Sequence, residues 1–377
     1  MSDNGGVNRA EAIIDPGAIR DNIALLRARA LGADFMAVVK ANGYGHGIVP
    51  VAGIAVESGA DCLGVAYPSE AMQLREAGVD APILAWLYTP QEDLAPLVAS
   101  DVQISVASVG MLEQVLAAAA SAGARARIHM KLDTGLGRNG CPPSGWQRLL
   151  HRVRLAQDEG LVEVIGIWSH LVSGEEPGAA ITAEQIEAFE LGLHEAERNG
   201  IVPRYRHLAN SGGVLNSPET HYDMVRCGIA MYGLSPGPAT GTSAELGLRP
   251  AMTLRSRIAL VKTVPAGQGV SYNHRYRTSR PTRLALVPVG YGDGVPRAGS
   301  GKLPVLVGDQ QVSVAGTVAM DQVVLDVGDL GVRSGDEVTL FGGAPGQPSA
   351  DDWARLCGTI NYEIVTGISA RVARMYP

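Results

Sequence analysis

Short apolar segments recur along residues 1–233 and alternate with segments of helical spacing. The apolar segments are rich in Val, Ile, Leu and Ala, as are strands buried on both faces. Asp15 and Pro16 form a start signal for the first helix, and several later helical segments end at a glycine. The pattern predicts strands at residues 35–40, 62–66, 82–87, 102–106, 127–133, 162–170, 206–210 and 225–232, with helices that include residues 69–77, 111–122, 146–157 and 182–198.

Eight strands that alternate with helices are typical of a (β/α)8 TIM-type barrel, an α/β fold. A doubly wound open sheet is the competing arrangement, and periodicity alone does not exclude it. The polar residues favour the barrel, because barrels build their active sites at the carboxyl ends of their strands. Polar residues at or near predicted strand ends are Lys40, Lys131, Asp133, His170, Asn210, Ser211 and Arg226.

The pattern changes near residue 234, where strand-like runs separated by Gly, Pro and Asp predict a mostly β domain. We therefore expect a (β/α)8 barrel over residues 9–233 and a C-terminal β domain over residues 234–377. Residues 9–14 are a candidate strand of the β domain. The runs predicted as strands lie at residues 251–264, 282–289, 303–307, 312–315, 323–327 and 337–341, and helices are predicted at residues 351–357 and after Tyr362.

Composition and charge limit which classes of molecule this protein is expected to bind. Of the 377 residues, 46% are apolar and 18% are charged, which permits a large core and excludes a disordered or coiled-coil chain. The net charge of −7, without a basic block, argues against nucleic acid and anionic membranes as partners and leaves a small molecule. The four cysteines are far apart and indicate neither a metal site nor disulfides. Residues 1–6 lack a signal pattern and no apolar run is long enough to span a membrane, so we expect a cytoplasmic protein.

The most informative segment is residues 37–47, which reads AVVKANGYGHG. A lysine at the end of a buried strand is held where the charged form is disfavoured, and an uncharged amine can form a Schiff base with an aldehyde. A strand-terminal lysine taken alone is more often an ordinary surface cation. The whole segment, however, closely resembles the cofactor-lysine signature of alanine racemases, which are pyridoxal-phosphate enzymes built from a barrel and a β domain.

The resemblance extends from about Ile13 to the carboxyl end, with the motifs in family order. Two departures occur: Leu171 begins LVSGEEP where a Phe-Ala-x-Ala-Asp pattern is expected before Glu-Pro, and Ala319 stands where the family usually has cysteine. The first departure leaves the local hydrogen bonding of residues 171–175 open. The matching segments read KLDTGLGRNG at 131–140, HLANS at 207–211, VRCGIAMYG at 225–233, GVSY at 269–272, VGYGDG at 289–294, MDQ at 320–322 and INYE at 360–363.

The resemblance implies interconversion of L-alanine and D-alanine through a pyridoxal-phosphate Schiff base, which supplies D-alanine for peptidoglycan. Lys40 would hold the cofactor and serve one face of the α-carbon, and Tyr272 would serve the other face. Tyr272 must be a phenolate to act as a base. His170 and Arg226 are candidates for the groups that favour this phenolate form. Arg226 would also donate a hydrogen bond to the pyridine nitrogen without giving up its proton.

The resemblance also implies which residues contact cofactor and substrate, and it implies no metal. His207 would lie near the cofactor. The lysine that matches Lys131 carries a carbamate in many family members and positions Arg138; we leave this modification open. The implied cofactor contacts are Lys40, Tyr44, His170, Asn210, Ser211, Arg226, Gly228, Ile229 and Tyr362, and the implied substrate contacts are Arg138, Met320, Asp321 and Tyr291.

A homodimer with shared active sites follows from the same resemblance, since Tyr272, Tyr291 and Met320 would be supplied to the partner's barrel. The alternatives are a broad-specificity or serine racemase of the same fold and a non-catalytic pyridoxal-phosphate carrier. Carriers of this type are lone barrels, whereas this chain adds a β domain that contains Tyr272. Arg226 argues against a related decarboxylase, in which an acidic residue is expected at that position. A sugar-phosphate barrel with a β appendage is the remaining reading, and it predicts no cofactor at Lys40.

Overall fold

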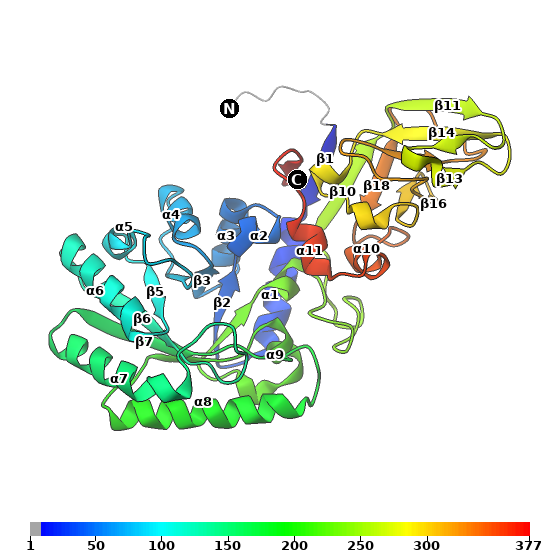
Figure 1. Ribbon diagram of the computed structural model, residues 1–377. Coiled ribbons are helices and arrows are strands. Elements are labelled where there is room, and N and C mark those ends of the chain that lie inside the picture. The colour runs from blue at the N-terminus through cyan, green and yellow to red at the C-terminus, as the bar shows by residue number, and fades with distance from the viewer. Residues whose placement is uncertain (1–8) are drawn as a thin grey trace. The chain divides into compact units, whose positions relative to one another are not determined.

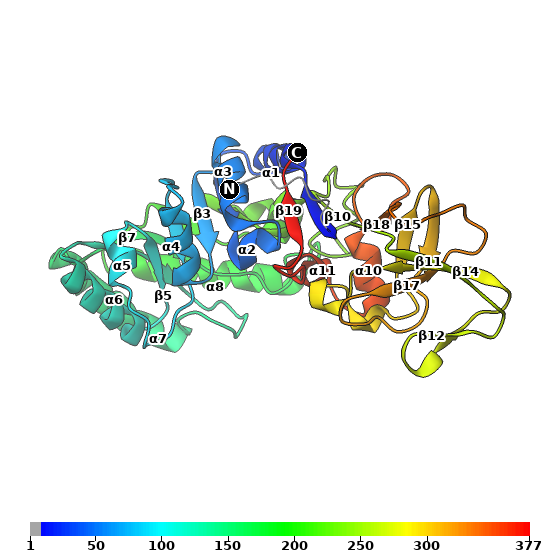
Figure 2. The ribbon, with the colours of Figure 1, turned by 90° about the horizontal axis from the view of Figure 1, so that it is seen from above.

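The computed structural model describes residues 9–377 (Figures 1 and 2). Contacts within the chain divide it into two compact units. The first unit consists of Ile19–Gly43 and Ile48–Leu248, and the second contains residues 9–18, Tyr44–Gly47 and Arg249–Pro377. Residues 1–6, in which no signal pattern was expected, lie outside the described residues. Among residues 9–377, no helix has both the length and the apolar character needed to cross a membrane.

Eight parallel strands form the centre of the first unit, and helices α4 to α8 lie along their outer side (Figures 1 and 2). The edge strands β8 and β9 approach one another, because Asp223 N donates to Arg206 O and Arg226 N donates to Ala209 O, both at 3.0 Å. The sheet is therefore a nearly closed barrel, which confirms the TIM-type prediction. In sheet order the strands are β8 (Tyr205–His207), β7 (Val162–Trp168), β6 (Ala126–Lys131), β5 (Gln103–Val106), β4 (Ile83–Ala85), β3 (Cys62–Val65), β2 (Asp34–Val38) and β9 (Met224–Cys227).

The barrel helices begin and end where the sequence signals indicate. Asp15 Oδ1 accepts a hydrogen bond from Ala18 N at 3.1 Å, so Asp15 caps the first helix. Gly123 ends α6 in the left-handed conformation with φ of 61°, which glycine adopts without strain. The helices are α1 (Pro16–Arg29), α3 (Ile48–Glu57), α4 (Pro68–Glu76), α5 (Ala95–Ala99), α6 (Val109–Ala122), α7 (Pro143–Asp158), α8 (Ala180–Arg198) and α9 (Ser211–Asn216).

The prediction of one strand over residues 225–232 was wrong beyond Cys227. Gly228 turns the chain at φ −108° and ψ −101°, and Ile229–Tyr232 then forms the short 3-10 helix η2. The whole run is buried, and a run that is apolar on every side has no period to separate strand from helix. The turn matters for function because it carries two of the expected cofactor contacts, Gly228 and Ile229.

The second unit is rich in β structure, as predicted. The expected single run at residues 251–264 divides between β10 and β11, which belong to different sheets. Strand β1 pairs antiparallel with β10 and parallel with β19. The six-stranded sheet has the order β16 (Gln310–Ser313), β15 (Pro304–Val307), β18 (Glu337–Phe341), β10 (Met252–Arg257), β1 (Ala10–Ile14) and β19 (Ala373–Met375). The smaller sheets are β11 (Leu260–Val264) with β14 (Thr282–Val287) and β17 (Val323–Asp326), and β12 (Gly269–Val270) with β13 (Tyr276–Arg277).

Two helices, α10 (Ala350–Cys357) and α11 (Asn361–Thr366), complete the second unit. Ser349 and Asp352 form a capping box at the start of α10. The buried Trp353 of α10 packs edge-on against Phe341 of β18, with ring centroids 5.2 Å apart. This aromatic contact attaches α10 to the six-stranded sheet.

Candidate active site

Lys40 lies immediately beyond β2 and begins the short segment α2 (Lys40–Tyr44). Burial is the main cause that lowers the pKa of its amine, and the charges of Arg138 and Arg226 lower the pKa further. Its Nζ lies 5.7 Å from the centroid of the Trp86 ring. The amine is thus shifted toward the neutral, nucleophilic form that attack on an aldehyde requires.

The backbone after Lys40 makes a left-handed turn. The φ angles are 52° at Ala41, 54° at Asn42 and 60° at Gly43. Non-glycine residues in this conformation cost about 1–2 kcal/mol each, so the surroundings must hold them. Glu70 Oε1 accepts from Ala41 N at 2.7 Å, and Asn42 Oδ1 accepts from Ile48 N at 3.0 Å. These bonds fix the direction in which the chain leaves Lys40.

Arg226 of β9 is 4% exposed and is held by neutral acceptors. Burial lowers the pKa of its guanidinium to about 9, so the group still carries its charge at neutral pH. Its Nη2 lies 3.2 Å from His170 Nδ1. Burial, followed by the charge of Arg226, lowers the pKa of His170 well below its ordinary value. The carbonyl oxygens that accept from Arg226 belong to His207 at 3.0 Å, Ser169 at 2.8 Å and Leu208 at 3.2 Å.

Lys131 ends β6 and is 4% exposed. Its Nζ lies over the Trp168 ring, 4.2 Å from the centroid. Burial, with further contributions from Arg226 and Arg138, lowers the pKa of the Lys131 amine to about 7. A substantial fraction of this amine is therefore neutral at physiological pH, as reaction with carbon dioxide requires.

The loop before Arg138 is shaped by Asp133. Its Oδ1 accepts from Gly135 N at 3.0 Å and from Gly137 N at 3.1 Å. The φ angles of these glycines are 129° and 67°, values that disfavour other residues. Gly135 and Gly137 therefore allow the backbone conformation of the loop that leads to Arg138.

Two short helices begin together at the ends of β8 and β9. Asn210 caps α9, since its Oδ1 accepts from Gly213 N at 3.0 Å. Ser211 Oγ accepts from Gly228 N at 3.0 Å. The Ser211 hydroxyl oxygen thus accepts from the amide N–H that precedes η2, and the hydroxyl hydrogen is left to donate.

A buried polar chain crosses β5, β6 and β8 inside the barrel. His129 Nε2 lies 2.7 Å from Gln103 Oε1, and His129 Nδ1 lies 2.8 Å from His207 Nε2. Because the amide oxygen only accepts, we assign the proton of each ring to Nε2, which leaves His207 Nδ1 as an acceptor. That atom has no hydrogen-bond partner among the described residues.

The polar chain is linked to the site by Trp168. The His207 and Trp168 rings are stacked, 5.6 Å apart with a 6° interplanar angle, and Lys131 Nζ lies over the same indole. Burial lowers the pKa of His129 to about 3, so the chain beneath the site is neutral. Sequence reasoning included His207 but missed Trp86, Trp168 and His129. Trp168 and His129 lie in strands two residues before the selected His170 and Lys131, and Trp86 directly follows β4 without a selected residue nearby in the sequence.

The second unit carries the remaining candidates. The rings of Tyr44 and Tyr362, the latter on α11, lie 6.2 Å apart between centroids. Tyr291 N donates to Ala319 O at 3.0 Å, and Gly292 N donates to Met320 O at 2.8 Å, so the turns that bear Tyr291 and Met320 are joined. Asp321, which follows Met320, pairs with Arg371 at 2.6 Å.

Three of the candidate residues in the second unit are exposed within this chain. Tyr272 is 66% exposed, Tyr291 42% and Met320 52%. Ser271, directly before Tyr272, has a φ of 58° and its hydroxyl donates to Thr317 O at 2.6 Å, which fixes the turn. A rigid turn that presents an exposed tyrosine is suited to contact a group outside its own unit.

The segment that departs from the family pattern is well packed. Leu171 is buried, and Val172 N donates to Gln185 Oε1 at 2.7 Å. Gly174 lies so close to Asn210 that a Cβ on the glycine would meet Asn210 Oδ1, the cap of α9. The hydrogen bonding of residues 171–175, left open by the sequence, thus involves Gln185. The glycine at position 174 leaves space for the Asn210 side chain that caps α9.

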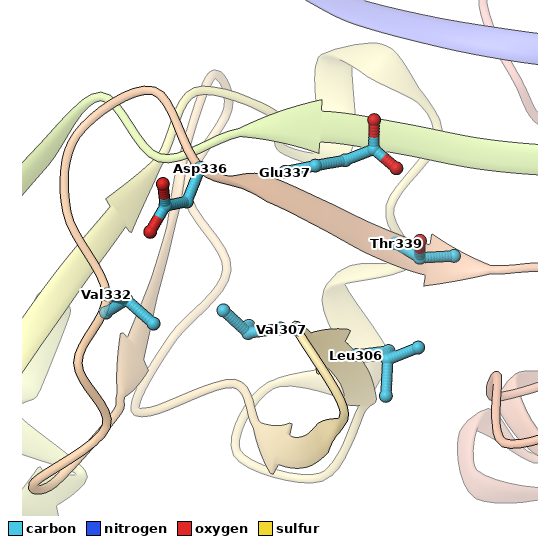
Figure 3. A pocket seen from close by; sticks show the side chains of 7 residues that line it. Leu306, Val307, Val332, Asp336, Glu337 and Thr339 are labelled. Carbon is cyan, nitrogen blue, oxygen red and sulfur yellow. The ribbon is translucent and has the colours of Figure 1, made fainter.

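A separate open hollow of about 350 Å³ lies in the second unit (Figure 3). Asp336 and Glu337 extend from its wall, and Glu337 pairs with Arg255 at 3.3 Å. None of the residues that line it was expected at the site. They are Leu306, Val307, Gly308, Val332, Asp336, Glu337 and Thr339.

A barrel with a lysine of lowered pKa directly after strand β2, in a chain that also has a β-rich part with an exposed tyrosine, is the arrangement expected of a pyridoxal-phosphate-dependent racemase. The family model "Alanine racemase, N-terminal domain" matches residues 14–236, and "Alanine racemase, C-terminal domain" matches residues 251–376. The chain belongs to the alanine racemase family, a family of pyridoxal-phosphate-dependent isomerases. The prediction made from the sequence motifs is thereby confirmed.

Individual relatives agree over nearly their full length. The chain is 51% identical to the alanine racemase of Frankia casuarinae, with 98% of this chain and 96% of the relative covered. The crystal structure of the enzyme from D-cycloserine-producing Streptomyces lavendulae superposes with a TM-score of 0.97 at 51% identity, covering 99% and 98% of the two chains. The Bacillus anthracis alanine racemase with bound L-Ala-P is 34% identical, with a TM-score of 0.91 and coverage of 99% and 96%.

Proposed function

We propose that this chain holds pyridoxal 5'-phosphate on Lys40 and racemises alanine with Lys40 and Tyr272 as opposing bases. The observation that carries the proposal is the Lys40 amine, whose pKa is lowered by burial and by two flanking arginine charges. The donors around it fit a cofactor with an anionic phosphate and a basic ring nitrogen. When bound, pyridoxal phosphate supplies a conjugated ring that acidifies the α-C–H bond of an amino acid joined to it.

Lys40 Nζ takes and returns the α-proton on one face. Burial and the charge of Arg138 lower the pKa of this amine, Glu70 raises it and Arg226 lowers it, and the net downward shift favours its role as a base. Arg226 would donate to the ring nitrogen and keep its own proton, since the pKa of its guanidinium is about 9. A ring nitrogen held in this way would stay unprotonated and would withdraw electrons less strongly.

The phosphate is held by neutral donors. The support for this step is the Ser211 hydroxyl, which lies 3.0 Å from Gly228 N, and the pair of tyrosine rings, Tyr44 and Tyr362, whose centroids are 6.2 Å apart. Ile229 N adds a second amide. Asn210 supports the phosphate site as the cap of α9, and His170 supports the ring-nitrogen side through its contact with Arg226.

Tyr272 serves the other face of the α-carbon, and we propose that it does so in the barrel of a second copy. Its exposure in this chain supports a homodimer with shared sites, as does the exposure of Tyr291 and Met320. In the shared site, Arg138 and the Met320 amide bind the substrate carboxylate, Asp321 supports the Met320 turn, and Tyr291 narrows the entrance.

Lys131 is the proposed site of a carbamate that positions Arg138. The neutral amine attacks the carbon of carbon dioxide, an N–C bond forms, the electron pair of one C=O π bond moves to oxygen and one N–H proton leaves to solvent. The carbamate places an anion beside Arg138, which attracts the guanidinium where the ammonium form of Lys131 would repel it.

The product, D-alanine, supplies peptidoglycan synthesis in the cytoplasm. The test is formation of D-alanine from L-alanine by the full chain with added pyridoxal phosphate, followed with a panel of single-enantiomer amino acids. We expect alanine to be the best substrate. Faster turnover of serine or lysine would indicate a racemase of different specificity, and bound cofactor without racemisation would indicate a carrier.

A further inference from the structure

The segment Tyr44–Gly47 is grouped by its contacts with the carboxyl-terminal part of the chain. Its backbone is unusual, since φ is 51° at Tyr44, 80° at Gly45 and 96° at Gly47. A tyrosine in the left-handed region carries a conformational cost and persists only where neighbouring groups hold it. The groups that hold the Tyr44 backbone therefore help to determine the position of the Tyr44 side chain.

Three successive carbonyl groups of this segment accept hydrogen bonds from side chains. Tyr44 O lies 2.8 Å from His46 Nδ1, within the segment itself. Gly45 O accepts from Arg374 Nε at 3.0 Å, and His46 O accepts from the Tyr376 hydroxyl at 2.6 Å. Two of the three donors thus come from the last four residues of the chain.

The Arg374 guanidinium donates its hydrogen bonds to backbone carbonyl groups. Besides Gly45 O, its guanidinium donates to Val372 O at 2.7 Å and to the carbonyls of Ser369 and Ile368. Burial lowers the pKa of this guanidinium, as expected for a cation surrounded by neutral acceptors. It therefore ties the segment to the turn that follows α11.

The segment also contacts α11. A Cβ at Gly45 would collide with the carbonyl of Val365, so the two backbones are in direct contact. Val365 is three residues beyond Tyr362 on the same helix. The segment is therefore held both by α11 and by hydrogen bonds from Arg374 and Tyr376, with the Tyr44 and Tyr362 rings 6.2 Å apart.

We propose that Arg374 and Tyr376 are positioning residues for binding of the cofactor phosphate. They contact neither substrate nor reacting atoms, and they act by holding the backbone that presents the Tyr44 hydroxyl. The inference rests on the proposed function, in which Tyr44 and Tyr362 donate to the phosphate. A phosphate held by neutral hydroxyls depends on hydrogen-bond geometry, so displacement of Tyr44 weakens retention of the phosphorylated cofactor in particular.

The test compares pyridoxal 5'-phosphate with pyridoxal, which keeps the aldehyde but lacks the phosphate. Full-length chain is loaded with either compound, and its loss after dilution is followed by absorbance. For Tyr376→Phe, which keeps the ring, we expect loss of pyridoxal phosphate to accelerate about tenfold, as for one hydrogen bond, while loss of pyridoxal is unchanged. Arg374→Lys is expected to behave in the same way.

Met375→Ala is the matched control, because Met375 lies between the two residues on β19 and its side chain is 40% exposed. It should release both compounds at the rates of the unmutated chain. Equal acceleration for both compounds, or no acceleration for either, in Tyr376→Phe would overturn the proposal. Failure of the unmutated chain to retain pyridoxal phosphate would instead contradict the proposed function, and would overturn this inference with it.

Discussion

At the scale of single residues, the proposed site contains two amines with lowered pKa values. Burial is the main cause at both Lys40 and Lys131, and the charges of Arg138 and Arg226 contribute to both shifts. Burial disfavours the ammonium form and the arginines repel it, so both effects have the same sign. In the proposed function the two lysines take different roles, Lys40 toward an aldehyde and Lys131 toward carbon dioxide.

Replacement of the two bases should have separable effects. Lys40→Ala is expected to abolish covalent attachment of pyridoxal phosphate. Tyr272→Phe should keep the attachment but stop racemisation, because only one face of the α-carbon then has a base. Exchange of the α-proton with deuterated solvent, measured from each enantiomer, should be lost in Tyr272→Phe from one enantiomer only. Loss from both enantiomers equally, or from neither, would show that the two-base assignment is wrong.

Modification of Lys131 should depend on pH. Its amine has a pKa of about 7, so the ammonium predominates below that value and the nucleophilic amine above it. We expect the carbamate to increase as the pH rises through 7 and to disappear as the pH falls below it. Carbon-13 NMR with labelled bicarbonate measures this, with Lys131→Gln as control. A signal of the same size in the control would place the carbamate elsewhere.

At the scale of elements, residue choices on the barrel strands leave space for the buried polar chain of Gln103, His129 and His207. Gly166 on β7 lies against the contact between His129 and His207, and a Cβ there would collide with the His129 ring. The position must therefore be glycine as long as His129 is present. The glycine at position 166 of β7 is therefore explained by His129 on β6 and His207 on β8, and not by a requirement of β7 itself.

We expect Gly166→Ala to destabilise the fold by about 1–3 kcal/mol, the usual cost of overpacking. Combining it with His129→Ala should recover part of that loss, since the colliding ring is then absent. Urea unfolding measures both variants. Gly53→Ala on α3 is the control, because a Cβ there meets nothing within 4 Å and alanine favours a helix. If the double variant showed strictly additive losses, the collision with His129 would not be the cause.

At the scale of the whole molecule, the proposed site needs two chains. Lys40 and Tyr272 belong to different units, and Tyr272 is largely exposed in its own chain. A homodimer with shared sites would bury Tyr272 and supply each barrel with the second base.

Mixed dimers test this arrangement. Neither Lys40→Ala nor Tyr272→Phe alone should racemise alanine, but a mixed dimer of the two would hold one site with both bases. After unfolding and refolding an equal mixture, we expect about a quarter of the normal activity, because half the dimers are mixed and one of their two sites is intact. Mixing Lys40→Ala with a chain that carries both Lys40→Ala and Tyr272→Phe should restore no activity. Absence of activity in the first mixture, with dimers present, would mean that each site is made from one chain.

The sequence by itself determined the succession of strands and helices, the helix start at Asp15, the glycine helix ends and the family, because these depend on local spacing and on short contiguous motifs. It did not determine that the strand ends at Cys227, or that residues 251–264 divide between two sheets, because buried runs look alike whatever their backbone conformation. Only the tertiary structure decided that Trp86, Trp168 and His129 lie around the selected residues. Those contacts join strands that are distant in sequence, and they arise only when the barrel brings those strands together.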